Sequence, residues 1–162
     1  ITAVVGSDKI MSNASSSFIS STFWTERIGP TAALKTLELM EKKKSWDYIT
    51  KLGKHIKKEW LRLARKHNLE ITIGGLDAIC NFKLEYENWI IYKTYITQEM
   101  LKSKILATNI IYVCQSHTKK SLNRYFKILD VIFSKISDAE RNSGVKHLLE
   151  SRQSDIGFKR IN

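Results

Sequence analysis

The sequence predicts an α/β (α+β) fold in which a small sheet is covered by helices on one face. Residues 45–68 and 118–136 repeat apolar side chains at helical spacing, whereas residues 71–86 alternate apolar and polar side chains as a half-buried strand pair does. The full predicted order is β, loop, α, α, β, β, α, β, α, which suits three or four strands under one layer of helices. The chain has 162 residues, 43% of them hydrophobic, and one Pro, a composition typical of one globular domain with a sizeable core.

The first part of the chain is expected to hold a strand, a loop and a helix. Residues 2–6 form a β-branched, apolar run that ends in Gly-Ser-Asp, which is typical of a buried strand that enters a turn. Residues 12–22 are rich in hydroxyl side chains and are expected to form a loop. Pro30 suits the first position of a helix, because no backbone N–H is needed there, and this helix should run to about Lys43.

The second part predicts two helices around a strand pair. Ser45 can cap a helix that continues to Asn68, with one apolar face and one strongly basic face. From Glu70 the period changes to that of strands, and the residues allow either a strand pair or one bent strand with one buried face. Residues 92–103 are then expected to form a short helix.

The last part predicts a strand over residues 105–114 and a long amphipathic helix capped by Thr118. The apolar stripe of that helix continues to Ile136, and its lysines and arginine are expected in solvent. Residues 137–162 are polar with little periodicity and are expected to form a loose tail. Cys80 and Cys114 each lie in an apolar run, so buried free thiols are expected rather than a disulfide or metal site.

Positive charge is the strongest compositional feature. Lys and Arg number 27 against 16 acids, a net charge of +11, and residues 41–66 alone carry ten bases and three acids. Such a segment could bind nucleic acid, with Trp46 and Trp60 stacking on bases. Both tryptophans lie on or near the apolar stripe instead, where packing explains them better. A small basic nucleic-acid-binding module is therefore kept as the alternative function, and nucleic acid is not the expected partner.

Most catalytic signatures are absent from the sequence. It contains no nucleophile elbow, no phosphate loop and no zinc-binding His-Glu-x-x-His, and its four histidines do not fall at metal-ligand spacings. No apolar run approaches the roughly 20 residues that cross a bilayer, so no membrane partner and a cytoplasmic location are expected. The run Ser20-Ser21-Thr22 before the Pro30 helix can bind phosphate through hydroxyls and amides, or can simply cap the loop.

Several short segments, in order from residue 1 to about residue 136, resemble a known family. It is the class III aminotransferases that depend on pyridoxal phosphate (PLP), and within it the branch like glutamate-1-semialdehyde 2,1-aminomutase. The segments are Ile1-Thr2-Ala3-Val4-Val5-Gly6, Lys9-Ile10-Met11, Ser21-Thr22-Phe23, Ala32-Ala33-Leu34, Thr36-Leu37, Gly75-Leu76-Asp77-Ala78, Tyr95-Ile96-Thr97-Gln98-Glu99-Met100-Leu101, Ile105-Leu106 and Ser116-His117-Thr118.

The resemblance implies the C-terminal part of a fold-type-I PLP-dependent transferase. Residues 1–44 would be the end of the large PLP-binding domain and the connecting helix, residues 45–138 the small C-terminal domain, and residues 139–162 a polar tail. The cofactor-binding lysine is expected upstream of Ile1, so this chain would hold no catalytic residue and be inactive alone. The intact parent would be a homodimer that transfers amino groups between a small-molecule donor and acceptor.

The resemblance also implies a cofactor site and leaves the substrate open. The hydroxyl of Thr22, assisted by the amide of Ser21 or Thr22, would bond the PLP phosphate of the neighbouring subunit. Thr72 stands where many class III members place an arginine for the substrate carboxylate, and Glu26-Arg27 stands where they often have Asn-Pro. The first departure argues against an α-amino acid held through that arginine. Neither the donor and acceptor nor the choice between transaminase and aminomutase follows from these residues.

Overall fold

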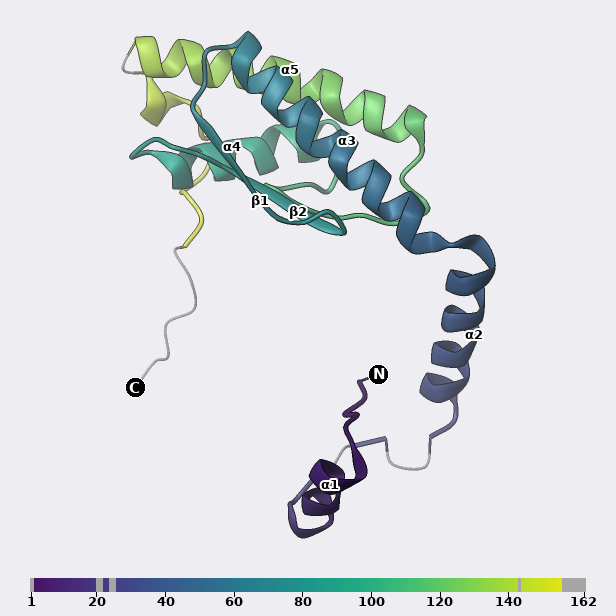
Figure 1. Ribbon diagram of the computed structural model, residues 1–162. Coiled ribbons are helices and arrows are strands. Elements are labelled where there is room, and N and C mark those ends of the chain that lie inside the picture. Colours follow the sequence, from purple (N-terminus) through teal and green to yellow (C-terminus); the bar gives the residue numbers. More distant parts are fainter. Residues whose placement is uncertain (1, 20–21, 24–25, 143, 156–162) are drawn as a thin grey trace. The chain divides into compact units, whose positions relative to one another are not determined.

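The structure is a computed structural model that describes residues 2–19, 22–23, 26–142 and 144–155 (Figure 1). The chain divides into two compact units, Ile1–Ser45 and Trp46–Asn162. The assignment of these segments to a large cofactor domain, a small domain and a tail stays a prediction.

The first unit is helical and has no apolar core among its described residues. It contains α1 (Asp8–Met11), the short 3-10 helix η1 (Ser12–Ser16) and α2 (Ile28–Lys43). The predicted strand over residues 2–6 is wrong, because these residues are exposed and form no strand. A β-branched run favours extended backbone, but a strand also needs a hydrogen-bonded neighbour, and the described part of this unit offers none.

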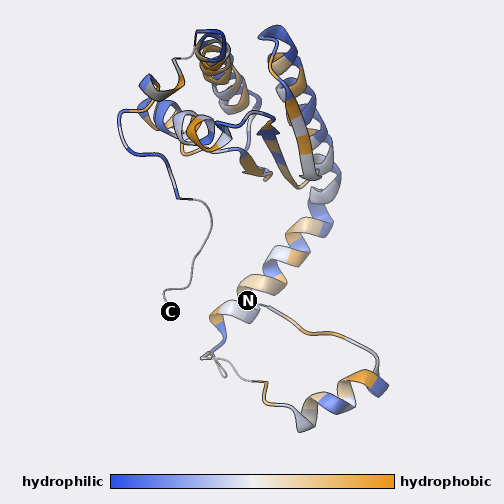
Figure 2. Cartoon of the chain, turned by 90° about the vertical axis from the view of Figure 1, so that its left-hand side faces the viewer, coloured by the Kyte–Doolittle hydropathy of each residue, from blue (hydrophilic) through white to orange (hydrophobic). Residues whose placement is uncertain are grey.

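Helix α2 confirms the predicted helix up to Lys43, but it begins at Ile28 rather than at Pro30, and its apolar side chains are not buried. Leu34 is 69% and Leu37 61% exposed, and no residue of α2 is buried. Figure 2 shows hydrophobic turns in orange recurring along this helix. The helix ends at Lys43, and the capping residue Lys44 has a φ of 47°, which is left-handed and uncommon for a residue other than glycine.

Helix α3 (Ser45–Lys66) opens the second unit and supplies one wall of its core. It begins at Ser45, where the sequence predicted the cap. Its apolar stripe is buried as predicted, with Ile56, Trp60 and Leu63 no more than 1% exposed. The periodic side chains, rather than the individual helix propensities, therefore anchor this long basic helix.

The sheet has three antiparallel strands in the order β1-β2-β3. Strands β1 (Ile71–Leu76) and β2 (Ile79–Leu84) form the predicted strand pair, with Ile71 opposite Leu84 and Leu76 opposite Ile79. The predicted strand over residues 105–114 is much shorter, because only β3 (Ile110–Tyr112) pairs, with residues 79–81 of β2. Alternation along β2 places Cys80, Phe82 and Leu84 on the buried face.

The hairpin between β1 and β2 lies against α3 at very short range. A Cβ atom at Gly53 would come within 1.8 Å of the Asp77 carbonyl oxygen, so only glycine fits there. Lys57, one turn further along α3, donates to the Gly75 carbonyl at 2.8 Å and to the Asp77 carboxylate at 2.9 Å. Gly75 itself has a φ of 74°, which glycine adopts without strain. These contacts fix the hairpin on the helix.

Helices α4 (Trp89–Lys102) and α5 (Lys119–Arg141) complete the helical layer on one side of the sheet (Figure 1). The predicted cap of α5 is confirmed, since the Thr118 hydroxyl accepts a hydrogen bond from the Ser121 amide at 3.2 Å. The helix continues beyond the predicted Ile136 to Arg141.

The segment after α5 returns to α4. It contains the 3-10 helix η2 (Val145–His147). Gln98 of α4 accepts from the Glu150 amide at 2.9 Å, and the Thr94 hydroxyl accepts from the Ser154 amide at 3.0 Å. The described part of this polar segment is thus hydrogen-bonded to the folded unit.

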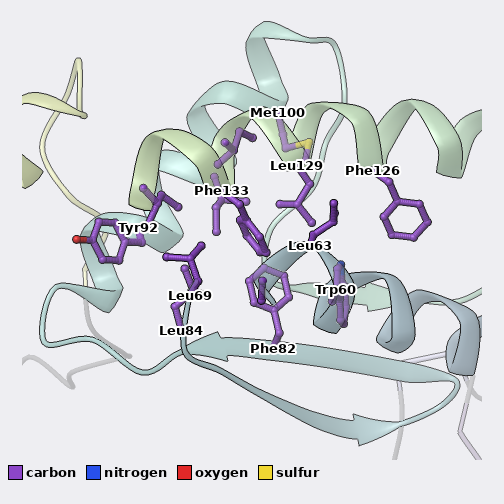
Figure 3. Packing of buried hydrophobic residues seen from close by; sticks show 14 of the residues in the cluster. Trp60, Leu63, Leu69, Phe82, Leu84, Tyr92, Met100, Phe126, Leu129 and Phe133 are labelled. Atoms are coloured by element: carbon purple, nitrogen blue, oxygen red, sulfur yellow. The ribbon is translucent and has the colours of Figure 1, made fainter. Parts of the chain in front are cut away.

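The core lies between the sheet and the three helices (Figure 3). The Phe82 ring of β2 meets Trp60 at 4.8 Å and Phe133 of α5 at 5.9 Å between ring centroids. The Trp60 indole N–H donates to the buried Tyr125 hydroxyl at 2.9 Å, which satisfies the only polar group that the indole brings into the core. Among the described residues, every helix is too short or too polar to span a bilayer.

Candidate functional site

Several serines of the hydroxyl-rich segment donate hydrogen bonds to backbone carbonyls of the same segment. The hydroxyls of Ser12 and Ser16 donate at 2.9 Å to the carbonyls of Lys9 and Asn13, three residues earlier, and Ser17 donates to the Asn13 carbonyl at 3.2 Å. Such local bonds stabilise short helical turns. The hydrogen atoms of these three hydroxyls are therefore used within the segment itself.

Thr22 is the predicted cofactor-binding residue that the structure describes. It lies with Phe23 in a turn ahead of α2, and its side chain is exposed. Ser21, the other predicted residue, lies outside the described residues. Of the two predicted residues, the structure therefore describes only Thr22, whose exposed side chain is accessible to a ligand.

Glu26 caps the start of α2, a role that was not predicted from the sequence. Its carboxylate accepts hydrogen bonds from the amides of Ile28 and, at 3.1 Å, Gly29, which are among the first amides of α2. A carboxylate at this end of a helix satisfies unpaired donors and complements the helix dipole. The signal in the sequence is an acid two residues before the helix start, a place where a carboxylate can accept from the first amides.

The described residues fit a phosphate group at Thr22 better than at the start of α2. A threonine hydroxyl can donate to a phosphate oxygen, and a charge-assisted bond of this kind is strong. The start of α2 already holds the Glu26 carboxylate, which would repel a second anion.

Fewer cations of the basic helix α3 are available to bind an anion than its composition indicates. Three of its cations are paired, Lys57 with Asp77, Arg62 with Glu59, and Lys66 with Asp130, at 2.6–2.9 Å. Trp60 is fully buried, which confirms that it packs rather than stacks on bases. Trp46 is 49% exposed, so the prediction that it packs holds only in part. Trp46 lies in the first turn of α3, before Ile49, the first hydrophobic residue of this helix that packs against the core, which explains the difference.

Cys80 and Cys114 differ in environment although both lie in apolar runs. Both are free thiols; Cys80 is buried as predicted, and burial raises the pKa of its thiol. Cys114 is exposed, so the prediction of a buried thiol there is wrong. It follows the end of β3, and its amide donates to the ring of His117 at 3.1 Å in the turn before α5. No cluster of three metal-ligating side chains occurs among the described residues.

Thr72, which the resemblance aligns with an arginine of many class III aminotransferases, lies exposed on β1 opposite Lys83. Its side chain therefore points to the face of the sheet away from the core. The structure does not bring Thr72 into the pockets lined by the described residues of the second unit.

Comparison with solved structures identifies the fold. No family model matches the chain, and no curated protein matches it by sequence. The PLP internal aldimine form of the FumI protein from Sphingopyxis sp. MTA144 matches with a TM-score of 0.73 and 16% identity, over 90% of this chain. The chain spans 36% of the length of that protein. The fold is thus that of the C-terminal part of a PLP-dependent fold-type-I protein, as the sequence predicted.

Proposed function

We propose that this chain is the C-terminal portion of a PLP-dependent aminotransferase or aminomutase. The observation that carries the proposal is the shared fold with a PLP-bound protein over 90% of the chain, in a stretch that makes up 36% of that protein. The parent would be a cytoplasmic homodimer that moves amino groups between small molecules. This chain would not do so alone, because the lysine that binds the cofactor would lie upstream of Ile1.

The first unit supports a parent that is larger than this chain. Large apolar side chains recur along it, among them Val5 at 88%, Phe18 at 97% and Ile28 at 79% exposure. Burying such side chains is worth roughly 1.5–3 kcal/mol each, so a unit that leaves them in water has little stability of its own. Burial of these side chains against further protein, such as a large cofactor domain, would supply the missing stability.

In this proposal Thr22 holds the cofactor across the dimer. Its exposed hydroxyl would donate to a phosphate oxygen of the PLP bound to the neighbouring subunit, with the backbone amide of Ser21 or Thr22 beside it. Bound PLP supplies the electron sink for amino-group transfer, and the protein positions it. The residues of this chain would thus orient the cofactor while the partner supplies the lysine.

The Thr22→Val variant of the intact parent tests this role. Loss of a hydroxyl bonded to a charged phosphate should cost about 1.5–3 kcal/mol of PLP binding, a rise in Kd of roughly tenfold to 150-fold. Thr36→Val is the matched control, because the Thr36 hydroxyl donates to the Ala32 carbonyl within α2 at 2.8 Å. The control should leave the Kd for PLP unchanged. Fluorescence titration of the apoenzyme with PLP measures both constants.

Mixing then tests whether Thr22 acts across the dimer. A Thr22→Val subunit that keeps the lysine is mixed with a subunit that lacks the lysine but keeps Thr22, which gives heterodimers with one complete site. Activity at limiting PLP should rise above that of either parent. Heterodimers proven by mass spectrometry without any gain in activity would mean that Thr22 acts in its own subunit. An unchanged PLP Kd in Thr22→Val would remove the residue from the site.

A further inference from the structure

The first turns of α5 and the residue that follows α4 line a shallow groove on the second unit. Its volume is about 840 Å³, and it is bordered by Ser103, Lys119, Lys120, Asn123, Arg124 and Lys127, with Ile128 beside them. The sequence predicts only that the basic residues of this helix lie in solvent. All of these residues belong to the second unit, and neither Thr22 nor PLP is needed to explain what the groove binds, so a proposal about it is independent of the proposed function.

The groove is uniformly positive. Four of its bordering residues are cations and none is a carboxylate. Lys119, Lys120 and Lys127 form no ion pair with the residues that the structure describes, and Arg124 donates to the Ser103 carbonyl rather than to an acid. This differs from α3, where three cations are paired with acids. The positive charge of the groove is therefore largely uncompensated.

Helix geometry aligns three of these cations. Lys120, Arg124 and Lys127 follow the spacing i, i+4, i+7, which places them along one face over about 10 Å of helix axis. All three are exposed. A row of cations at this spacing can contact successive phosphates of a polynucleotide strand, whereas a single small anion would use only one or two of them.

The end of the helix adds to the positive potential. Lys119 and Lys120 occupy the first turn of α5, which contains no acid. The amino end of a helix carries partial positive charge and favours anions, so two lysines there are unfavourable by themselves. A bound anion would relieve this repulsion. The long-range field of a chain with net charge +11 favours the approach of the same kind of ligand.

We infer that this groove binds the phosphodiester backbone of a nucleic acid duplex without reading its sequence. Protein partners of stable interfaces need an apolar centre with aromatic anchors, and the groove offers only the half-buried Ile128. It also lacks an aromatic side chain on which an unpaired base could stack, which disfavours single strands. Cations with Asn and Ser side chains between them are what phosphate oxygens require, and DNA and RNA share this backbone.

The test compares two triple variants of the 162-residue chain that have the same net charge. The groove variant is Lys119→Gln, Lys120→Gln and Lys127→Gln, which keeps the contact of Arg124 with Ser103. The control is Lys51→Gln, Lys54→Gln and Lys58→Gln on the exposed face of α3. Fluorescence anisotropy with a labelled duplex of about 20 base pairs of DNA, long enough to span the row of cations, is measured over a series of salt concentrations. The corresponding RNA duplex and single strand are measured in the same way, and circular dichroism verifies that both variants are folded.

The groove variant should bind duplexes more weakly by at least about tenfold at low salt, while the control stays within about threefold. The slope of log affinity against log salt should become shallower by roughly 0.9 for each phosphate that is no longer neutralised. Comparison of the two duplexes shows which nucleic acid is preferred. If both variants bind equally weakly, the loss of affinity follows from net charge alone, and the assignment of binding to the groove is wrong. Absence of duplex binding by the unmodified chain, or equally tight binding of polyglutamate, would overturn the nucleic acid assignment.

Discussion

At the scale of single residues, Gly53 shows how closely α3 and the hairpin approach each other. Replacing it with Ala improves helix propensity by up to about 1 kcal/mol, but the added Cβ would lie 1.8 Å from the Asp77 carbonyl oxygen. Backbone must then move, so Gly53→Ala should lower the free energy of unfolding by about 1–3 kcal/mol. Urea denaturation followed by circular dichroism measures the change.

Gly144→Ala is the matched control for this prediction. Its φ is −87° and a Cβ there meets nothing within 4 Å, so the variant should be neutral or more stable by up to about 1 kcal/mol. A Gly53→Ala protein as stable as the original would mean that the hairpin does not press on α3.

Residues whose role is local were accessible from the sequence, and residues whose role depends on distant partners were not. Thr118 marks the start of α5 through its own chemistry, and this cap was predicted. Pro30 indicates a helix in the same way but lies third in α2, in the first turn, where a missing N–H is still tolerated. Gly53 owes its role to Asp77, and nothing in the neighbouring residues of α3 indicates that contact. The same limit applies to the site. The hydroxyl run gave Thr22 only as one of several possible phosphate ligands, and the family resemblance then singled it out. The basic groove on α5 depends on which cations remain unpaired after folding.

At the scale of elements, Asp130 joins the end of α3 to α5. Its carboxylate meets Lys66 Nζ and His67 Nε2, each at 2.6 Å. The hydrogen bond from Lys66, and then that from His67, holds the pKa of Asp130 below its ordinary value. A pKa that is lower in the folded state stabilises the protein above the unfolded pKa, and this stabilisation disappears as the pH falls through the folded pKa.

Asp130→Asn should therefore lower stability at pH 7 by up to about 1 kcal/mol, and the difference from the original protein should shrink as the pH falls below about 4. Urea denaturation at neutral and at acidic pH, about 7 and about 3, measures it. Asp138→Asn serves as the control, because the Asp138 pair with Arg141 stays within α5 and is exposed. A penalty for Asp130→Asn that is the same at both pH values would contradict the electrostatic explanation.

Elements whose apolar side chains repeat regularly were predicted at the right residues, whereas strands that depend on a pairing partner were not. The stripes of α3 and α5 give both helices, and the alternation in residues 79–84 gives β2. Residues 2–6 and 105–114 are both apolar runs, yet the first forms no strand and the second pairs over only three residues. Apolar runs of this length have no period that separates a strand from extended chain, so the partner decides.

At the scale of the whole molecule, the apolar core belongs entirely to the second unit. Every described buried hydrophobic residue lies between Ile56 and Val145. A chain that starts at Lys44 should therefore unfold cooperatively, with a Tm within about 4 °C of that of the full chain, a difference of roughly 1 kcal/mol or less. Calorimetry of the two chains measures this. A shortened chain that unfolds gradually, or at a much lower temperature, would show that the first unit stabilises the second.

The two thiols can be used to measure how often the core of the second unit becomes accessible to solvent. Cys114 is exposed and should react at once with a thiol reagent, whereas Cys80 lies at 0% exposure beneath the sheet. A pulse of reagent followed by mass spectrometry would count the molecules that carry one label and those that carry two. The rate at which the second label appears measures how often the core opens under native conditions, without denaturant and without an added probe.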